Sequence, residues 1–184
     1  IAPKQVISFA EVLHEADKRG IEATFRVPIT EVYQCTEGFL GATCSHGTMH
    51  LNEDFIHFDQ EWIDETHFFP IVTDFSRSSQ PVVKYKLNDV LEVKKTPCGC
   101  GDVRLAIERI VGRDDDVLIL KGIRVYPDLV ARRIAQTTDD FSQYRIVQTA
   151  ENHLTLGIAC DTANFEKLKT RFITTLDALF EIGR

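Results

Sequence analysis

The chain has 184 residues, of which 43% are hydrophobic, and its formal net charge is −7 at pH 7. This apolar content is enough to form a core and excludes an intrinsically disordered chain. The acidic balance, without a cluster of Lys and Arg, argues against nucleic-acid binding, which needs concentrated positive charge. No apolar run reaches the roughly eighteen residues of a membrane span, so we expect a soluble, cytoplasmic protein.

The first part of the chain, to about Arg113, is predicted to be mostly β structure. A helix is expected over 10–19, where apolar residues share one face. Short polar turns between the following segments imply antiparallel connections. Leu51 and Phe55 are expected to face inward. The expected extended segments are 28–33, 39–44, 50–58, 68–75, 82–85 and 90–94. Because a strand-like pattern begins almost at Ile1, we expect the chain to be a piece of a longer protein.

The last part of the chain changes to a mixed pattern of helices and strands. A buried strand is expected over 117–120, and Pro127 is well placed to open a helix that reaches residue 135. A hairpin is expected over 144–149 and 153–160. The final helix, 164–180, has apolar residues at spacings of three and four. The pattern predicts an α/β (α+β) protein: a β-rich region over 1–113, then a small strand–helix–strand–strand–helix domain over 114–184.

The first motif is Val32-Tyr33-Gln34-Cys35-Thr36-Glu37-Gly38, a strand that runs into a turn. The ring of Tyr33 can stack on adenine, the Thr36 hydroxyl can bond a phosphate and the Glu37 carboxylate can hold Mg²⁺. The alternative is a β-turn with a polar tip. Five-residue matches of this kind are common, so this segment alone does not decide between the two.

Two further motifs follow in the sequence. In 83–89, Asp89 stands at a strand end, where a carboxylate can accept hydrogen bonds from both ribose hydroxyls. The alternative there is a strand that ends in a turn-forming Asn-Asp pair. The third motif, 112–127, combines a charged loop, an apolar strand, a glycine turn and a helix that starts with proline. Its length makes it the most specific of the three.

In this order the three motifs resemble the adenylate-forming superfamily, which includes acyl-CoA synthetases, peptide-synthetase adenylation domains and firefly luciferase. Within it, the chain looks most like the phenylacetate-CoA ligase branch. The resemblance implies that 1–113 is the carboxy-terminal part of the large AMP-binding domain. It also implies that 114–184 is the small mobile domain, with the phosphate loop upstream of the chain and the catalytic lysine after Arg184.

The resemblance also implies roles for individual residues. Thr36 and Glu37 would act in catalysis, with Glu37 as a ligand of Mg²⁺, and Asp115 would be the hinge of the small domain. The residues that would contact ATP or AMP are Tyr33, Gln34, Thr36, Asp89 and Arg113. The implied function is ATP-dependent activation of a carboxylic acid, commonly aromatic in this branch, as an acyl-adenylate, with CoA or another molecule as acceptor. The alternatives are a non-catalytic nucleotide-binding module, AMP transfer to a cofactor hydroxyl and a zinc-stabilised interaction domain; a homodimer stays open.

Cysteine and histidine form a second candidate site. Cytoplasmic thiols stay reduced, so the five cysteines suggest metal ligation or burial rather than disulfides. Cys44, His50, Cys98 and Cys100 can supply a tetrahedral, structural Zn²⁺, with His46 in reserve. Phenylacetate-CoA ligase relatives look similar here. The alternatives are a core cysteine, a surface histidine and a bare loop, or a Cys–His nucleophilic pair.

Overall fold

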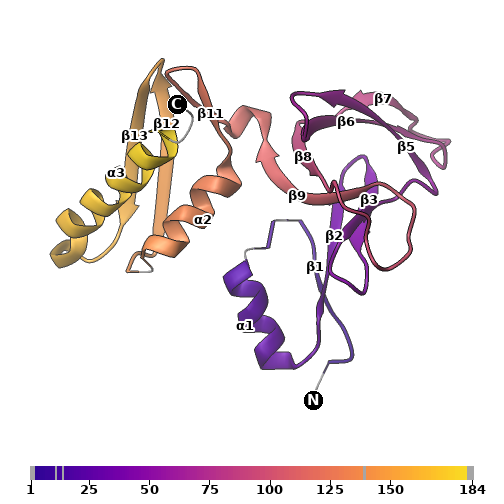
Figure 1. The fold of residues 1–184 in the computed structure, drawn as a ribbon, viewed down its shortest axis with the longest axis horizontal. Coiled ribbons are helices and arrows are strands. Elements are labelled where there is room, and N and C mark those ends of the chain that lie inside the picture. The colour runs from indigo at the N-terminus through magenta and orange to yellow at the C-terminus, as the bar shows by residue number, and fades with distance from the viewer. Residues whose placement is uncertain (1–2, 11, 14, 139, 182–184) are drawn as a thin grey trace. The chain divides into compact units, whose positions relative to one another are not determined.

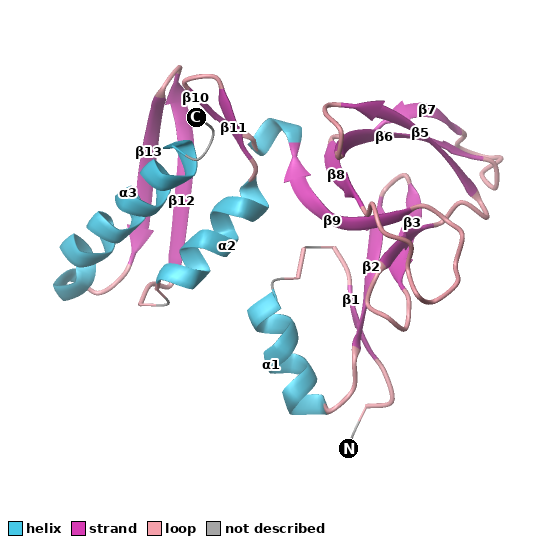
Figure 2. Cartoon of the chain, in the orientation of Figure 1, coloured by secondary structure: helices cyan, strands magenta, loops and turns pink. Residues whose placement is uncertain are grey.

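The computed structural model describes residues 3–10, 12–13, 15–138 and 140–181. The chain divides into two compact units, Ile1–Ile110 and Val111–Arg184, and each has its own hydrophobic core. Strands dominate and a few helices accompany them, which confirms the expected α/β class (Figures 1 and 2). The division falls three residues before the boundary expected from the sequence, which was set after Arg113.

The first unit holds helix α1 (Glu15–Phe25) and a nine-stranded sheet in the order β1-β2-β3-β4-β9-β8-β6-β5, with β7 paired to β6. Strands β1 and β2 are parallel, and α1 lies between them in the chain, as a parallel pair requires. The pairs β2–β3, β3–β4, β4–β9, β5–β6, β6–β7 and β6–β8 are antiparallel. The strands are β1 (Val6–Ser8), β2 (Ile29–Cys35), β3 (Gly38–Thr43), β4 (Met49–Leu51), β5 (Ile56–Trp62), β6 (His67–Asp74), β7 (Val82–Lys86), β8 (Asp89–Val93) and β9 (Ala106–Arg113).

The predicted helix over 10–19 is wrong at both ends. Ala10 has a φ of 80°, which is incompatible with a helix, and the described helix begins only at Glu15. Acidic residues in its first turn favour that start. Arg26, with a φ of 58°, provides a left-handed cap, and its N–H donates to the Glu22 carbonyl. Residues 11 and 14 lie outside the described part of the chain.

The single extended segment expected over 50–58 is also wrong, because it is two strands, β4 and β5, with a turn between them. The carbonyl of Asn52 accepts the N–H groups of Phe55 and Ile56, and this closes the turn. Phe55 therefore lies on the turn and is 61% exposed, contrary to the expectation that it faces inward. Leu51 is fully buried, as expected.

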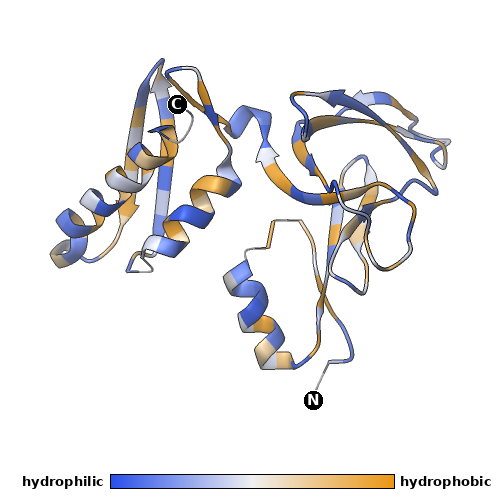
Figure 3. Cartoon of the chain, viewed as in Figure 1, coloured by the Kyte–Doolittle hydropathy of each residue, from blue (hydrophilic) through white to orange (hydrophobic). Residues whose placement is uncertain are grey.

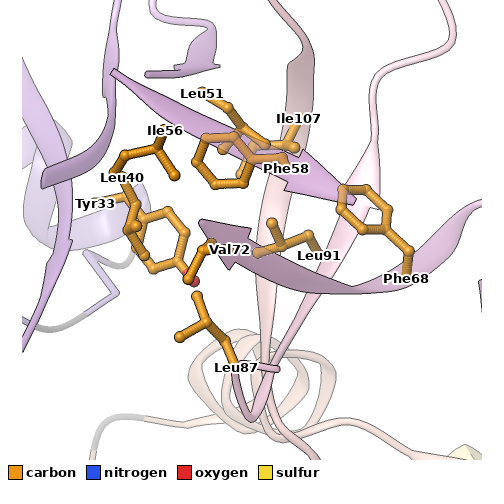
Figure 4. Packing of buried hydrophobic residues seen from close by; sticks show 10 residues of the cluster. All are labelled: Tyr33, Leu40, Leu51, Ile56, Phe58, Phe68, Val72, Leu87, Leu91 and Ile107. Carbon is orange, nitrogen blue, oxygen red and sulfur yellow. The ribbon is translucent and has the colours of Figure 1, made fainter. Parts of the chain in front are cut away.

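The core of the first unit lies between strands that are distant in sequence. Side chains of β2, β3, β4, β5, β6, β8 and β9 converge on it, and the ring of Tyr33 points into the cluster (Figure 4). Along these strands hydrophobic and hydrophilic residues mix, as a sheet with one covered face requires (Figure 3). The buried members are Tyr33, Leu40, Leu51, Ile56, Phe58, Phe68, Val72, Leu87, Leu91 and Ile107.

The second unit contains the expected strand, helix, hairpin and final helix, and one further strand, β11, that precedes the first helix. The apolar spacing of α3 does bury one face, with Phe172 in edge contact with Phe141 and Tyr144. The elements are β10 (Leu118–Leu120), β11 (Ile123–Val125), α2 (Pro127–Thr137), β12 (Gln143–Ala150), β13 (His153–Ala159) and α3 (Phe165–Glu181), with short 3₁₀ turns at Asp114–Asp116 and Thr162–Asn164.

Candidate functional site

The turn between β2 and β3 carries the first motif. The hairpin closes at the pair Cys35 and Gly38, after an irregularity between Tyr33 and Gln34. Thr36 is exposed and Glu37 is half-buried at the tip of this turn. Gly38 has a φ of 153°, which disfavours any residue with a side chain, so the tight connection depends on glycine there.

Tyr33 joins the first motif to the second. Its hydroxyl donates a hydrogen bond of 2.6 Å to Asp89 Oδ2, across 56 residues of sequence. Burial, and then the negative charge of Asp89, raises the pKa of Tyr33 well above its usual value, so the phenol stays protonated and keeps donating. The ring is 6% exposed and packs in the core. Its stacking on adenine and the ribose contact of Asp89 stay predictions.

Cys35 lies within the same motif, beside the carboxylate of Glu37. Burial, followed by the hydrogen bond with Glu37, raises the pKa of the Cys35 thiol to about 11. The thiol is therefore protonated at neutral pH, and a nucleophilic role would need the thiolate. Gln34, expected to contact the nucleotide, is exposed, and that role also stays a prediction.

The third motif lies in the second unit. Asp115 belongs to an exposed 3₁₀ turn, where its carboxylate is 3.7 Å from Arg113 Nε. A Cβ atom added to Gly112, whose φ is 132°, would lie 2.8 Å from Cδ of Pro127. Only glycine therefore allows the chain to pass the start of α2 this closely. The roles expected for Arg113 at the ribose and for Asp115 at the hinge stay predictions.

Cys44, His50, Cys98 and Cys100 form the second candidate site. One ligand atom from each lies within 4.8 Å of all the others. The two Sγ atoms of Cys44 and Cys98 are 3.6 Å apart, and Cys100 Sγ is 3.4 Å from His50 Nε2. Tetrahedral Zn²⁺ with ordinary bond lengths would separate two sulfurs by about 3.8 Å, and a sulfur and a nitrogen by about 3.5 Å. The observed distances, 3.6 Å between the two sulfurs and 3.4 Å between sulfur and nitrogen, fit that ion.

The surroundings of the cluster also suit a metal. His50 is 2% exposed, and its Nδ1 lies 3.2 Å from the carbonyl oxygen of Arg104, which leaves Nε2 to face the sulfurs. The backbone N–H of His46 donates to Cys44 Sγ, so this residue supports the cluster through its main chain and its ring is not one of the four ligands. The alternative that His50 lies on the surface of a strand is wrong, because the residue is buried.

The charge state of Cys98 agrees with this arrangement. The Thr48 hydroxyl, followed by the backbone of Cys100 and by His50, holds the pKa of the Cys98 thiol down at about 5. Thiolate is the form that binds metal ions. Sequence reasoning missed the supporting pair Asp102 and Arg104, whose only signal was their place just after Cys100.

Comparison with known proteins gives phenylacetate-coenzyme A ligases among the related sequences. The chain is 26% identical over 160 residues to a phenylacetate-coenzyme A ligase of Thermus thermophilus, a match that covers 79% of the chain and 35% of the relative. It is 25% identical over 91 residues to the Escherichia coli enzyme of the same name, covering 50% of the chain and 20% of the relative. No family model matches. The chain thus spans about a third of the length of the first of these relatives.

Solved structures show the same fold. A 2-hydroxyisobutyryl-CoA ligase in complex with an acyl-AMP superposes with a TM-score of 0.72 at 19% identity, over 89% of this chain and 39% of that one. An anthranilate CoA ligase with bound anthranoyl-AMP gives 0.64 at 12% identity, over 92% and 37%. The chain is thus similar in sequence to phenylacetate-CoA ligases and shares the fold of these acyl-CoA ligase structures.

Proposed function

We propose that the chain is part of a ligase that activates a carboxylic acid with ATP as an acyl-adenylate and then transfers the acyl group to CoA. The hydrogen bond between Tyr33 and Asp89 carries this proposal, because it joins in one place the two motifs to which the resemblance assigns nucleotide binding. Several of the relatives are phenylacetate-CoA ligases, which supports an aromatic acid as the substrate class.

In this proposal the residues position and stabilise more than they react. Glu37 holds Mg²⁺, Thr36 contacts a phosphate, and Asp89 accepts the ribose hydroxyls. Attack by the substrate carboxylate on the α-phosphate then needs alignment and charge neutralisation, and no protein nucleophile. The protonated thiol of Cys35 agrees with that view. The first unit would belong to the large AMP-binding domain, and the second would be the small domain that turns about Asp115.

Pyrophosphate exchange tests the proposal. The full encoded polypeptide should exchange labelled pyrophosphate into ATP when an aryl acid is added, and a panel of aryl and alkyl acids should show which class is used. Binding of ATP without exchange for any acid would instead favour a non-catalytic nucleotide-binding module. Exchange that needs a cofactor with a free hydroxyl, and no acid, would favour AMP transfer to that cofactor.

We further propose that the four-residue cluster binds a structural Zn²⁺. Three sulfurs and one imidazole suit this ion, and the site has no open position for a substrate if all four residues bind. The metal would join the β3–β4 connection to the loop before β9. All five cysteines are free thiols, which suits the reducing cytoplasm, where we place the protein. Among the described residues, no helix is long and apolar enough to cross a membrane.

A further inference from the structure

Arg77, in the loop after β6, reaches the turn that carries the first motif. Its Nη2 donates a hydrogen bond of 3.1 Å to the carbonyl oxygen of Thr36, 41 residues away in sequence. The same guanidinium has its Nε 3.2 Å from Oδ2 of Asp74, the last residue of β6. Arg77 therefore connects the end of one strand to the turn between two others.

Asp74 is a firm anchor for this arginine. It is 8% exposed, and its Oδ1 accepts hydrogen bonds from the Ser76 hydroxyl, at 2.6 Å, and from the Ser76 N–H, at 2.8 Å. These bonds, the hydroxyl first, and the charge of Arg77 hold the pKa of Asp74 below its usual value. Both carboxylate oxygens are thus in use, and the group is ionised at neutral pH.

The turn itself lies against this anchor. A Cβ atom on Gly38 would be 3.7 Å from Asp74 Oδ2 and 3.4 Å from the Ile56 side chain. A side chain added at Gly38 would thus be in van der Waals contact with Asp74 and Ile56, so the turn passes close to both residues. Arg77 fixes the backbone one residue before Glu37. Because Arg77 bonds a main-chain oxygen, it can set the position of the turn whatever side chain stands at residue 36.

We infer that Asp74 and Arg77 are positioning residues, which hold the Thr36–Glu37 turn so that the Glu37 carboxylate points at its metal ion. The inference rests on the proposed function, in which Glu37 binds Mg²⁺. A purely structural contact would change the stability of the unit and leave the metal requirement alone. A positioning contact changes the magnesium dependence and leaves the affinity for the acid unchanged.

The test compares Arg77→Met and Arg77→Lys with the unchanged protein in the full encoded polypeptide. The control is Lys94→Met, which also removes a cation paired with a carboxylate, that of Glu108, directly after β8, a strand paired to β6. Loss of one hydrogen bond from a charged donor should raise the Mg²⁺ concentration for half-maximal pyrophosphate exchange about tenfold in Arg77→Met. Arg77→Lys should fall between, and the control and the KM for the acid should not change.

An Arg77→Met protein with a lower melting temperature but an unchanged magnesium requirement would overturn the inference. If the unchanged protein exchanges no pyrophosphate with any acid, the proposed function fails. The positioning role of Arg77 is then tested by calorimetric titration of ATP at several Mg²⁺ concentrations. There the positioning role predicts weaker, more magnesium-dependent binding in Arg77→Met. Equal titration curves, or no binding of MgATP by the unchanged protein, would also overturn it.

Discussion

Removal of the proposed Zn²⁺ should strongly destabilise the first unit. The cluster joins two chain segments, since Cys44 and Cys98 are 54 residues apart in sequence. A cross-link over a loop of this length restricts the unfolded chain by about 4 kcal/mol in the chain-entropy relation for disulfides. A metal that binds only the folded state adds its own binding free energy to this amount.

The size of the effect follows from the size of the unit. For about 110 residues, the entropy of unfolding converts 4 kcal/mol into a fall in melting temperature of roughly 15 °C. The fall should appear on treatment with a strong chelator and in the variant Cys98→Ser, and excess Zn²⁺ should reverse the chelator effect. Elemental analysis should give one zinc per chain before treatment.

The matched control is Cys160→Ser, which changes a free cysteine of the second unit and none of the four ligands. It should keep its zinc and its melting temperature. The reasoning is refuted if the purified protein holds no stoichiometric metal and a chelator leaves its melting curve unchanged. A Cys98→Ser protein that retains one tightly bound zinc would show that the ligand set is wrong.

Three further perturbations test other parts of the structure. Asp74→Asn should lower the melting temperature at pH 6 to 8. Because the pKa of Asp74 in the folded protein lies below its unfolded value, the ionised carboxylate stabilises the fold above about pH 4. The difference in melting temperature between the two proteins should therefore vanish as the pH falls below that value. Asp89→Asn should weaken AMP binding about tenfold in calorimetry with little loss of stability, because an amide can still accept the Tyr33 hydroxyl but is a weaker acceptor for the ribose; unchanged affinity would exclude Asp89 from the site. Gly112→Ala should destabilise the second unit by about 1–3 kcal/mol more than Gly122→Ala, as measured by denaturant titration. Both glycines have a positive φ, but only a Cβ at Gly112 would meet a side chain, that of Pro127 at the start of α2. Equal losses of stability in the two variants would contradict the steric argument.

The sequence alone determined most local elements and carried the resemblance to the adenylate-forming superfamily. Short polar turns indicated the antiparallel strands, and three-and-four spacing located α3 with its buried face. The motifs around Tyr33, Asp89 and Arg113 indicated this resemblance because all three occur in the same order along the chain. Four candidate metal ligands could be named because thiol and imidazole side chains are few and chemically distinctive.

Other features were decided by tertiary contacts that no local pattern encodes. Helix α1 starts at Glu15, because the chain first bends at Ala10, and Phe55 is exposed because Asn52 closes a turn inside an apolar stretch. The short strand β11 was missed because three residues after a glycine turn carry almost no periodic signal.

The candidate site shows the same division between sequence and structure. The sequence supplied Tyr33 and Asp89 as separate motifs, and pairing across the sheet brought the hydroxyl of one to the carboxylate of the other. The pair Asp74 and Arg77 had no motif at all, because its partner is the main-chain carbonyl of Thr36, and any residue there offers the same oxygen. Residue types and their spacing can therefore name ligands, whereas a contact with the main chain depends only on where folding places the backbone.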